Sequence, residues 1–586
     1  MEKVLHSLNR KLIAADKHRD LINKYKTLCT DEERIVFTLN VMLEYNIIPQ
    51  ACGDIKDAKE SEKLREQGNK LFVSTPLKNY TCVDALKLYT KSIAYAPYPS
   101  EQLALAYANR SAVLIKLHKY ELCIQDIDRA LALTYPNNLR AKLCVRKVEC
   151  LNALGHPRME DAIKEAQYWL EKMSSDDINR KKLSEKLNNT KHNLASQKLK
   201  KQNTIKQPPL PKIKTRNIEV PCASDAVTIK YNEEYGRHIV ATHKIRPGEV
   251  IAVEKPYSLI LTPDNIHTHC SNCLEVSWAN IPCEHCTYAM YCSEECKIME
   301  WKKYHDVECT VFPSMLKMNF VKLDLFSLRL AIQAVREATH IQELRKELKE
   351  VDSCFSKDGT FPSDKYRSLL GLVTNTEKRS VQDLFRRSLD ASFILYFVAT
   401  CTNMFGNPLS KDLSVLIKNA DVTFVGGLIL RHQQLIPNNI HSECGLEAVE
   451  RGAAAMPFSS LINHSCNPNI LRHSRSEYVI IYLYDIYTQH YAITPKAVRQ
   501  EKLLKQYYFK CNCLPCQEDW PLKFNKYVNI ATEGNISDKH IVDDLLKMIE
   551  VLYELVPMPC TEMNNVVETL KRVYDLNGNR FEIPEL

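Results

Sequence analysis

Apolar residues recur at helical spacing from the start of the chain. Val4, Leu5, Leu8 and Leu12 would share one face of a helix, with charged and polar residues between them. Residues 1–57 are therefore predicted to form a helical lead-in.

The same spacing continues as an imperfect repeat over residues 58–170. Each copy reads as two amphipathic helices joined by a tight turn. Small side chains such as Ala85 and Ala112 stand where the helices would cross closely, and Pro97 and Pro136 are expected to end the second helix of a copy. Because one helix pair cannot bury its apolar face alone, stacked copies would share a core and present a concave groove.

Residues 171–216 form a polar stretch that predicts a linker, part of which could be a lone helix before the run QPPLPK breaks it. The pattern changes after this stretch. Residues 217–269 then alternate apolar and polar positions between turn signals, as short strands do. Helical spacing returns over residues 310–450 and again over residues 521–586. The predicted fold class is a multidomain α+β protein, with an N-terminal α-helical solenoid, a mostly-β middle and short C-terminal helices.

Composition limits the classes of function. A chain of 586 residues with 45% hydrophobic and 26% charged content is typical of a globular protein of three or four domains. The net charge of +8 permits acidic partners but does not require nucleic acid. The first twenty residues are charged throughout and no apolar run reaches the length of a membrane span, so we expect neither a secretory signal nor a membrane partner. In a reducing compartment, metal ligation explains clustered members of the 22 cysteines better than disulfides do.

One short segment gathers eight soft metal ligands in four ordered pairs. They are Cys270, Cys273, Cys283, Cys286, Cys292, Cys296, His305 and Cys309. Zinc takes four thiolate or imidazole ligands, so eight ligands predict two ions. Scattered buried thiols are the alternative, because free Cys packs as a small hydrophobe, but four ordered pairs argue against it. So short a segment has almost no core, and metal binding would supply its folding energy.

The order C-x2-C, C-x2-C, C-x3-C, H-x3-C over residues 270–309 resembles the MYND zinc finger. The resemblance implies two interleaved sites and a proline-rich peptide as a partner. The two ligand sets would be Cys270, Cys273, Cys292 and Cys296, and Cys283, Cys286, His305 and Cys309. No basic recognition helix accompanies the finger in the sequence, so we expect protein contacts rather than direct DNA binding.

The string SSLINHSCNPNI at residues 459–470 resembles the hallmark of SET methyltransferases. A plain polar turn is the alternative, since Asn, Ser and Pro favour turns. Together with the finger, the string makes the chain similar to the SET- and MYND-domain (SMYD) family of protein-lysine methyltransferases, in its branch with TPR repeats. The resemblance implies a SET domain in two parts, residues 217–269 and 451–500, split by the MYND finger and by the helical insert of residues 310–450.

The resemblance further implies S-adenosylmethionine as the methyl donor. The matching donor-binding positions are Tyr235, Gly236, Arg237, Asn439, Asn463, His464, Tyr487 and Phe509. His238 stands where the family usually has a second glycine, so the backbone would approach the donor less closely. Asn438 is the alternative to Asn439, and core packing is the alternative for Phe509.

A third zinc site is expected in the post-SET segment, residues 501–520. Cys511, Cys513 and Cys516 supply three ligands, whereas a structural zinc needs four. In the family pattern Cys466 is the fourth, which gives three zinc ions per chain.

The catalytic residue that the resemblance implies is Tyr487, and the alternative is that Tyr487 is one tyrosine among several in an aromatic-rich strand. The surrounding stretch, residues 479–492, is about ten residues shorter than the family pattern and lacks one of its strands. Methyl transfer needs a neutral lysine aligned with the methyl group rather than much acid–base chemistry. The first hypothesis is therefore an S-adenosylmethionine-dependent protein-lysine N-methyltransferase. The alternative is a catalytically weak or inactive scaffold that binds protein partners and regulates transcription.

In the helical repeat, five polar residues match the two-carboxylate clamp of TPR domains. They are Arg65, Asn69, Asn109, Lys142 and Arg146. Converging cations and amides hold carboxylates well, so the resemblance implies the acidic C-terminal tail of a heat-shock chaperone as a partner. The family usually has Lys at the first position, and Arg keeps the charge but not the geometry. An ordinary solvated face is the alternative. The resemblance places the protein in the cytoplasm and the nucleus.

Overall fold

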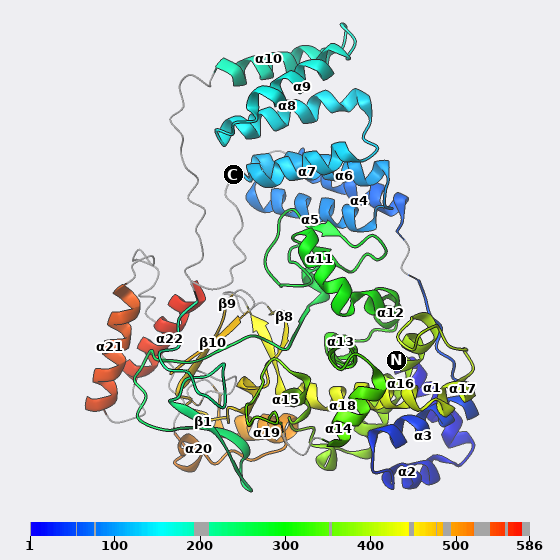
Figure 1. Cartoon of the computed structure of the whole chain (residues 1–586), viewed down its shortest axis with the longest axis vertical. Coiled ribbons are helices and arrows are strands. Elements are labelled where there is room, and N and C mark those ends of the chain that lie inside the picture. Colours follow the sequence, from blue (N-terminus) through cyan, green and yellow to red (C-terminus); the bar gives the residue numbers. More distant parts are fainter. Residues whose placement is uncertain are drawn as a thin grey trace. The chain divides into compact units, whose positions relative to one another are not determined.

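A computed structural model of the chain forms two compact units (Figure 1). It describes residues 2–53, 56–74, 78–192, 210–350, 354–444, 450–475, 478–483, 491, 494–520, 540–556 and 561–576. The first unit consists of Met1–Gly53, Pro209–Thr262 and Glu300–Arg580, and the second of Asp54–Pro208, Pro263–Met299 and Phe581–Leu586. The chain is thus multidomain and rich in helices, with small sheets, in agreement with the prediction.

The second unit is built on consecutive helix pairs. Its helices are α4 (Ala58–Phe72), α5 (Asn79–Tyr95), α6 (Glu101–Lys116), α7 (Tyr120–Ala132), α8 (Asn137–Ala153), α9 (Met159–Glu171) and α10 (Ile178–His192). Each helix packs on the next from α4 to α9, as the repeat predicts. A Cβ at Gly68 would overlap the ring of Tyr89, so the glycine lets α4 and α5 cross closely.

Two details of this stack differ from the expectation. Pro136 is the N-cap of α8 instead of the end of α7, a place that suits proline because no helical N–H is lost there. Helix α10 lies inside the predicted linker and packs on α8 and α9, with Leu187 buried. Leu183 and Leu187 are one turn apart and face that cluster.

A buried ion pair joins this stack to residues just before β5 (Ile281–Pro282), which pairs with β6 (Met290–Tyr291). Arg110 donates two hydrogen bonds to Asp126, and both side chains are fully buried. The same guanidinium donates to the carbonyl of Asn280 at 2.8 Å. Breaking a buried pair leaves an uncompensated charge, so Arg110 and Asp126 are held in place, and the bond to Asn280 fixes the segment just before β5 against α6.

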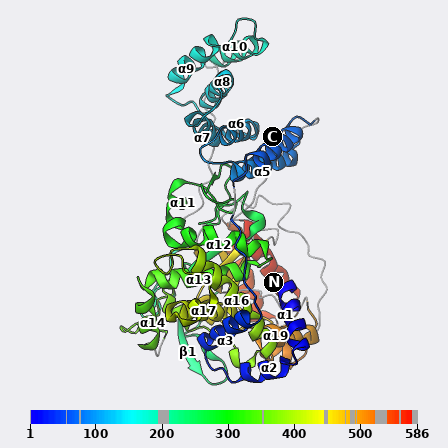
Figure 2. The ribbon, with the colours of Figure 1, turned by 90° about the vertical axis from the view of Figure 1, so that its right-hand side faces the viewer.

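The core of the first unit is a group of long helices that includes the lead-in. It contains α1 (Glu2–Ala14), α2 (His18–Lys26), α3 (Asp31–Glu44), α12 (Asp306–Lys317), α13 (Lys322–Glu337), α14 (Ile341–Glu350), α15 (Tyr366–Leu370), α16 (Val381–Cys401), α17 (Leu413–Lys418) and α18 (Ala420–Asn439). Helix α3 packs on α16, α17 and α18. Figure 2 shows α3 beside α16 and α17. Leu8, Ile35 and Leu39 are fully buried in this core, and a Cβ at Gly426 would overlap Ile35. The lead-in is therefore an integral layer of the first unit.

Three small antiparallel sheets complete the first unit. They are β1 (Val227–Asn232) with β2 (Gly236–Ala241); β3 (Val250–Glu254) with β10 (Tyr478–Leu483) and β9 (Ile470–Arg475); and β4 (Ser258–Leu261) with β8 (Glu450–Ala455) and β7 (Ile440–Cys444). In the two larger sheets, strands from before the finger pair with strands from after the helical insert: Val479 lies opposite Glu254, and Ser258 opposite Ala455. The pairings bring the two predicted parts of the β region together.

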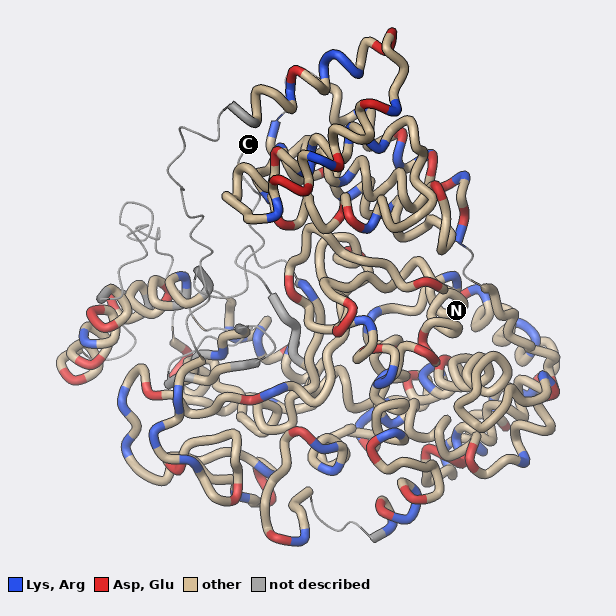
Figure 3. The backbone as a smooth tube through the Cα atoms, turned by 45° about the horizontal axis from the view of Figure 1, so that its top comes forward, with Lys and Arg blue, Asp and Glu red and all other residues tan. Residues whose placement is uncertain are grey.

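Helices α19 (Lys496–Tyr507), α20 (Leu514–Gln517), α21 (His540–Leu555) and α22 (Thr561–Leu576) follow the last strand. Helices α21 and α22 pack against each other around Ile549 and Val573. Among the described helices, none combines the length and apolarity needed to cross a bilayer. Basic and acidic residues are interspersed along both units (Figure 3), which fits the modest net charge.

Candidate functional site

Three groups of soft ligands mark metal-type sites. In each group, the ligand atoms all lie within 4.8 Å of one another. The groups are Cys270, Cys273, Cys292 and Cys296; Cys283, Cys286, His305 and Cys309; and Cys466, Cys511, Cys513 and Cys516. These are the sets that the family resemblance implies.

Local backbone geometry builds the first two groups. Leu274 adopts a left-handed conformation with φ 59°, and its N–H donates to the carbonyl of Cys270, which closes the C-x2-C turn. His305 and Cys309 are one helical turn apart, so both side chains share a helix face. Their helix contains a π-helical turn, η3 (Trp301–His305), a feature that often occurs at functional sites.

The sulfur atoms are close enough to require a cation or protons between them. The Sγ atoms of Cys292 and Cys296 are 3.5 Å apart, and those of Cys273 and Cys292 are 3.9 Å apart. Hydrogen bonds from the neighbouring thiols lower the pKa of Cys296, which favours its thiolate form. Four thiolates at this spacing would repel one another unless a cation such as Zn²⁺ holds them.

The third group joins the NHSC string to the segment after α19. The Sγ atoms of Cys466 and Cys516 are 3.6 Å apart, and the backbone N–H of Cys466 donates to the Sγ of Cys513. The fully buried Arg499 donates to the Sγ of Cys516 at 3.6 Å and to the carbonyl of Thr494 at 2.6 Å. Arg499 places positive charge beside the sulfurs, and no local sequence pattern indicates this role.

Gly236, one of the candidate donor-binding residues, is the first residue of β2 and has φ +64°. A Cβ at this position would meet nothing within 4 Å, so the backbone here is open to an approaching ligand. Tyr235 is 46% exposed, and its ring lies 5.7 Å from that of His238. Arg237 donates to the carbonyl of Gly371, so its guanidinium faces the segment after α15.

Asn439 ends α18 with its side chain already engaged. Its Nδ2 donates to the carbonyls of Val373 and Leu435, both at 2.8 Å. The hydroxyl of Ser460, in the short turn η5 (Ser459–Leu461), donates to the carbonyl of Asn439. For Asn438, the Oδ1 is buried and accepts no hydrogen bond from a described residue. Both asparagines therefore stay candidates for the donor.

His464 and Phe509 lie side by side, with ring centroids 6.1 Å apart. Burial lowers the pKa of His464 to about 4, so the imidazole is neutral near pH 7. Phe509 is 37% exposed, which does not suit a ring packed in a core. It follows Tyr508, which has φ 62° and ends α19.

Glu254 is a functional candidate that sequence reasoning did not find. Its buried carboxylate accepts hydrogen bonds from the N–H of Phe458 at 2.8 Å and from the N–H and hydroxyl of Ser459 at 2.9 and 2.5 Å. These residues lead directly into Asn463 and His464. Burial raises the pKa of Glu254 to about 7. Its position inside a strand gave no signal, because its partners lie about 200 residues away.

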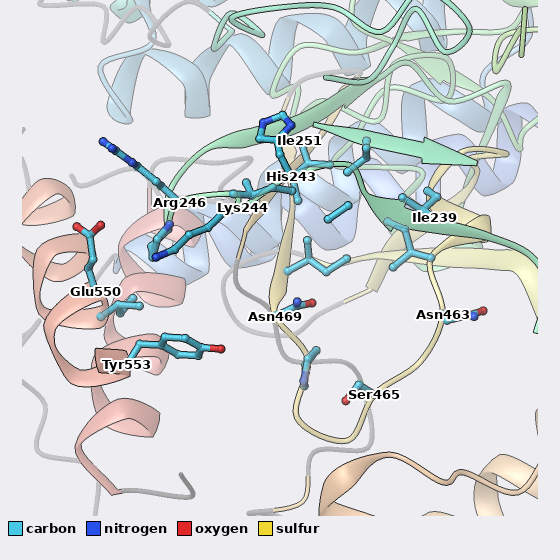
Figure 4. A pocket seen from close by; sticks show the side chains of 18 of the residues that line it. Ile239, His243, Lys244, Arg246, Ile251, Asn463, Ser465, Asn469, Glu550 and Tyr553 are labelled. Carbon is cyan, nitrogen blue, oxygen red and sulfur yellow. The ribbon is translucent and has the colours of Figure 1, made fainter. Parts of the chain in front are cut away.

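A cavity of about 470 Å³ opens beside the NHSC string (Figure 4). Its walls are Ile239 of β2, Arg246 in the following turn, Asn463 and Asn469 of the string, and Glu550 of α21. Its lining combines apolar side chains with the cations of Lys244 and Arg246 and the carboxylates of Glu550 and Glu554. Tyr487 and most of the shortened stretch lie outside the described residues.

The clamp residues of the helical stack are partly engaged with one another. The Oδ1 of Asn69 accepts hydrogen bonds from the hydroxyl of Tyr89 and the amide of Asn109, both at 2.8 Å. Arg65 pairs with Glu62 at 3.5 Å. The Nη1 of Arg146 donates to the carbonyl of Ala108 and the hydroxyl of Ser111.

Lys142 lies one turn from Arg146 on the same helix. Burial lowers its pKa, and the positive charges of Arg146 and Lys186 lower it further. The structure thus brings Asn69 and Asn109 together and leaves a cluster of positive charge near Lys142.

Comparison with known proteins agrees with this picture. The model of the MYND finger family matches residues 270–309. The protein-lysine N-methyltransferase SMYD4 of Pongo abelii is 27% identical over 552 residues, which cover 79% of this chain and 68% of that protein. SMYD4 of Homo sapiens is 26% identical, with the same coverage of 79% and 68%. The histone-lysine N-methyltransferase ASHR1 of Arabidopsis thaliana is 24% identical over 48% of this chain and 53% of that protein.

Proposed function

Because the chain belongs to the SET- and MYND-domain (SMYD) family, we propose that it transfers a methyl group from S-adenosylmethionine to a lysine of a protein substrate. The relatives are named protein-lysine methyltransferases. The pairing of β3 with β10 and of β4 with β8 supports a SET domain assembled from two parts, and the helix pairs from α4 to α9 support a TPR stack.

The observation that carries the proposal is the gathering of the candidate donor residues around η5. Ser460 of η5 bonds Asn439, η5 contacts β2, and Asn463 and His464 follow η5 directly. His464 in turn lies beside Phe509. Residues from β2, from the end of α18, from the segment after η5 and from the segment after α19 therefore lie around the same part of the first unit.

S-adenosylmethionine would supply an electrophilic methyl group at this place. We assign Gly236, Asn439 or Asn438, and Asn463 to its polar parts and the half-exposed ring of Phe509 to its adenine. We place the acceptor in the cavity of Figure 4, because Asn463 borders it and Glu550 offers a carboxylate to a lysine ammonium. After the ammonium has given a proton to solvent, the neutral lysine nitrogen would bond to the methyl carbon, and S-adenosylhomocysteine would leave with the electron pair of the broken carbon–sulfur bond.

Three zinc ions would hold the scaffold of the site. The first two fix the finger, and the third ties Cys466, three residues after Asn463, to the segment that carries Phe509. We further propose that the helical groove near Lys142 takes an acidic chaperone tail and that the finger takes a proline-rich peptide.

Donor binding tests the proposal directly. Calorimetry of the zinc-loaded chain with S-adenosylhomocysteine should show one site, and Asn463→Ala should weaken binding about tenfold, the effect of losing one hydrogen bond to the ligand. Asn467→Ala, in the same loop, is the matched control and should bind like the unchanged chain. Failure of the unchanged chain to bind would refute the proposal.

A labelling assay separates the enzyme from the scaffold. Radiolabelled donor with a protein extract should label lysines of at least one protein. Binding of S-adenosylhomocysteine without any labelling would favour the scaffold hypothesis.

A further inference from the structure

Arg379 makes an unusually complete set of contacts between the two flanks of the candidate donor site. It lies between η4 (Thr376–Lys378) and α16, and its side chain is 2% exposed. Its Nε donates to the carbonyl of Thr374 at 3.0 Å, and its Nη2 to the carbonyl of Gln434 at 2.7 Å. Its Nη1 donates to Asp383 at 3.0 Å and to the hydroxyl of Tyr508 at 3.3 Å.

One flank that Arg379 holds is the last turn of α18, which carries Asn438 and Asn439. Pro437 has no N–H, so the carbonyl of Gln433 receives no helical hydrogen bond from it. Arg387 of α16 fills that gap by donating to Gln433 at 2.7 Å. Arg379 holds the next carbonyl, that of Gln434, which also accepts from the side chain of Asn438. The two arginines thus stabilise a turn that proline would otherwise loosen.

The other flank is Tyr508, the residue before Phe509. Its φ of 62° is a left-handed conformation that costs energy for a residue with a side chain. Arg379 bonds its hydroxyl, and the guanidinium lies 5.5 Å from the ring centroid, a cation–π distance. These contacts of Arg379 therefore stabilise the left-handed backbone conformation of Tyr508, which places Phe509 beside His464.

We propose that Arg379 is a positioning residue for donor binding, which sets the last turn of α18 and the Tyr508–Phe509 step at a fixed separation. The inference rests on the proposed function, because it assigns the donor to the space between these flanks. Arg379 acts through Asn438, Asn439 and Phe509 and does not itself touch the donor.

Arg387 is the matched control for Arg379. It lies on α16 and shares Asp383 of that helix as a partner with Arg379. It holds the neighbouring carbonyl of α18, but no contact with Tyr508 is described for it. A purely structural role would make the two arginines equivalent. Arg379→Met leaves Asp383 paired with Arg387, which limits the damage to the fold.

Calorimetry with S-adenosylhomocysteine on the full zinc-loaded chain measures the first effect. Arg379→Met should weaken binding about tenfold to a hundredfold, as expected when charge-assisted hydrogen bonds are lost, and more than Arg387→Met does. Tyr508→Phe removes only the hydroxyl, keeps the ring and should weaken binding in the same direction by a smaller factor. Equal losses for the two arginine variants, or no loss for Arg379→Met and Tyr508→Phe, would overturn the inference.

Hydrogen exchange of the chain without donor supplies an independent reading. Amides around Tyr508 should exchange faster in Arg379→Met than in Arg387→Met, because only the first variant releases that residue. If the unchanged chain failed to bind S-adenosylhomocysteine, the proposed function would be refuted. The difference in exchange would still show whether Arg379 holds Tyr508 in place. Unchanged exchange around Tyr508 would refute the positioning even if donor binding were present.

Discussion

At the scale of single residues, some functional candidates can be found from local sequence spacing, whereas others can be found only from the folded structure. Eleven of the twelve metal-type ligands could be nominated from closely spaced residues such as Cys511 and Cys513, whereas Cys466 came only from the family resemblance. Glu254, Arg379 and Arg499 could not, because each acts on carbonyls, amides or sulfurs brought near by the fold. Gly236 could be nominated only from the family resemblance, because its φ of +64° is known only from the folded structure.

Glu254 gives a pH prediction at this scale. Its folded-state pKa, about 7, lies above the ordinary 4.5, so its contribution to stability is full below pH 4.5 and is lost as the pH rises to 7. Between pH 5.5 and 7.5 the unfolding free energy should fall by about 2 kcal/mol relative to Glu254→Gln, which stays neutral. Chemical denaturation across this range measures the difference.

Glu233→Gln is the control for this experiment, because Glu233 is an exposed carboxylate in the turn between β1 and β2. Its pH profile should follow that of the unchanged chain. Parallel profiles for Glu254→Gln and the unchanged chain would show that the buried carboxylate does not govern this pH response.

At the scale of elements, the sequence predicted the presence of the helices better than it predicted where they end and which elements they contact. Amphipathic spacing predicts the stacked pairs from α4 to α9, since each buries one face. The same spacing did not extend the stack to α10, whose polar surface resembles a linker although Leu187 is buried. The strand partners could not be predicted, because β3 and β10 are separated by the finger and the whole helical insert.

The third metal group yields a prediction for the element it would hold. Cys466→Ser should lower the zinc content from three ions per chain to two, because a structural zinc needs four ligands. It should also weaken donor binding, since Phe509 lies two residues before Cys511. Elemental analysis after gel filtration measures the first effect and calorimetry the second.

Cys29→Ser, at an exposed cysteine outside the three groups, should keep three ions. A full zinc complement in Cys466→Ser would remove Cys466 from the ligand set.

At the scale of the whole molecule, segments far apart in sequence form one core in the first unit. Helix α3 lies against α16 and α18, and Gln434 donates to Asp31 across 403 residues. The sequence predicted a helix here but no role for it, because an amphipathic face does not name its partner. The two glycines of α18 that admit α3, Gly426 and Gly427, are visible in the sequence, but their use is a property of the assembled helices.

Ile35 measures how much this layer contributes. Ile35→Ala should lower the unfolding free energy of the first unit by about 2 to 5 kcal/mol, because its side chain is fully buried among large apolar residues. Ile13→Ala, at a residue 68% exposed, should change it little. Equal effects of the two substitutions in a denaturation experiment would contradict the buried placement of α3.

The distance between α3 and its partners along the chain has a consequence during synthesis. A ribosome adding about 5 to 20 residues per second needs roughly 20 to 80 s to travel from α3 to the end of α18. For most of that interval, until α16 emerges, the apolar side of the nascent α3 lacks the helices that cover it in the folded unit. The polypeptide therefore stays aggregation-prone while the intervening stack can already fold. Ribosome-bound intermediates halted before α16 should therefore capture holdase chaperones through their first fifty residues and release them once α18 has emerged.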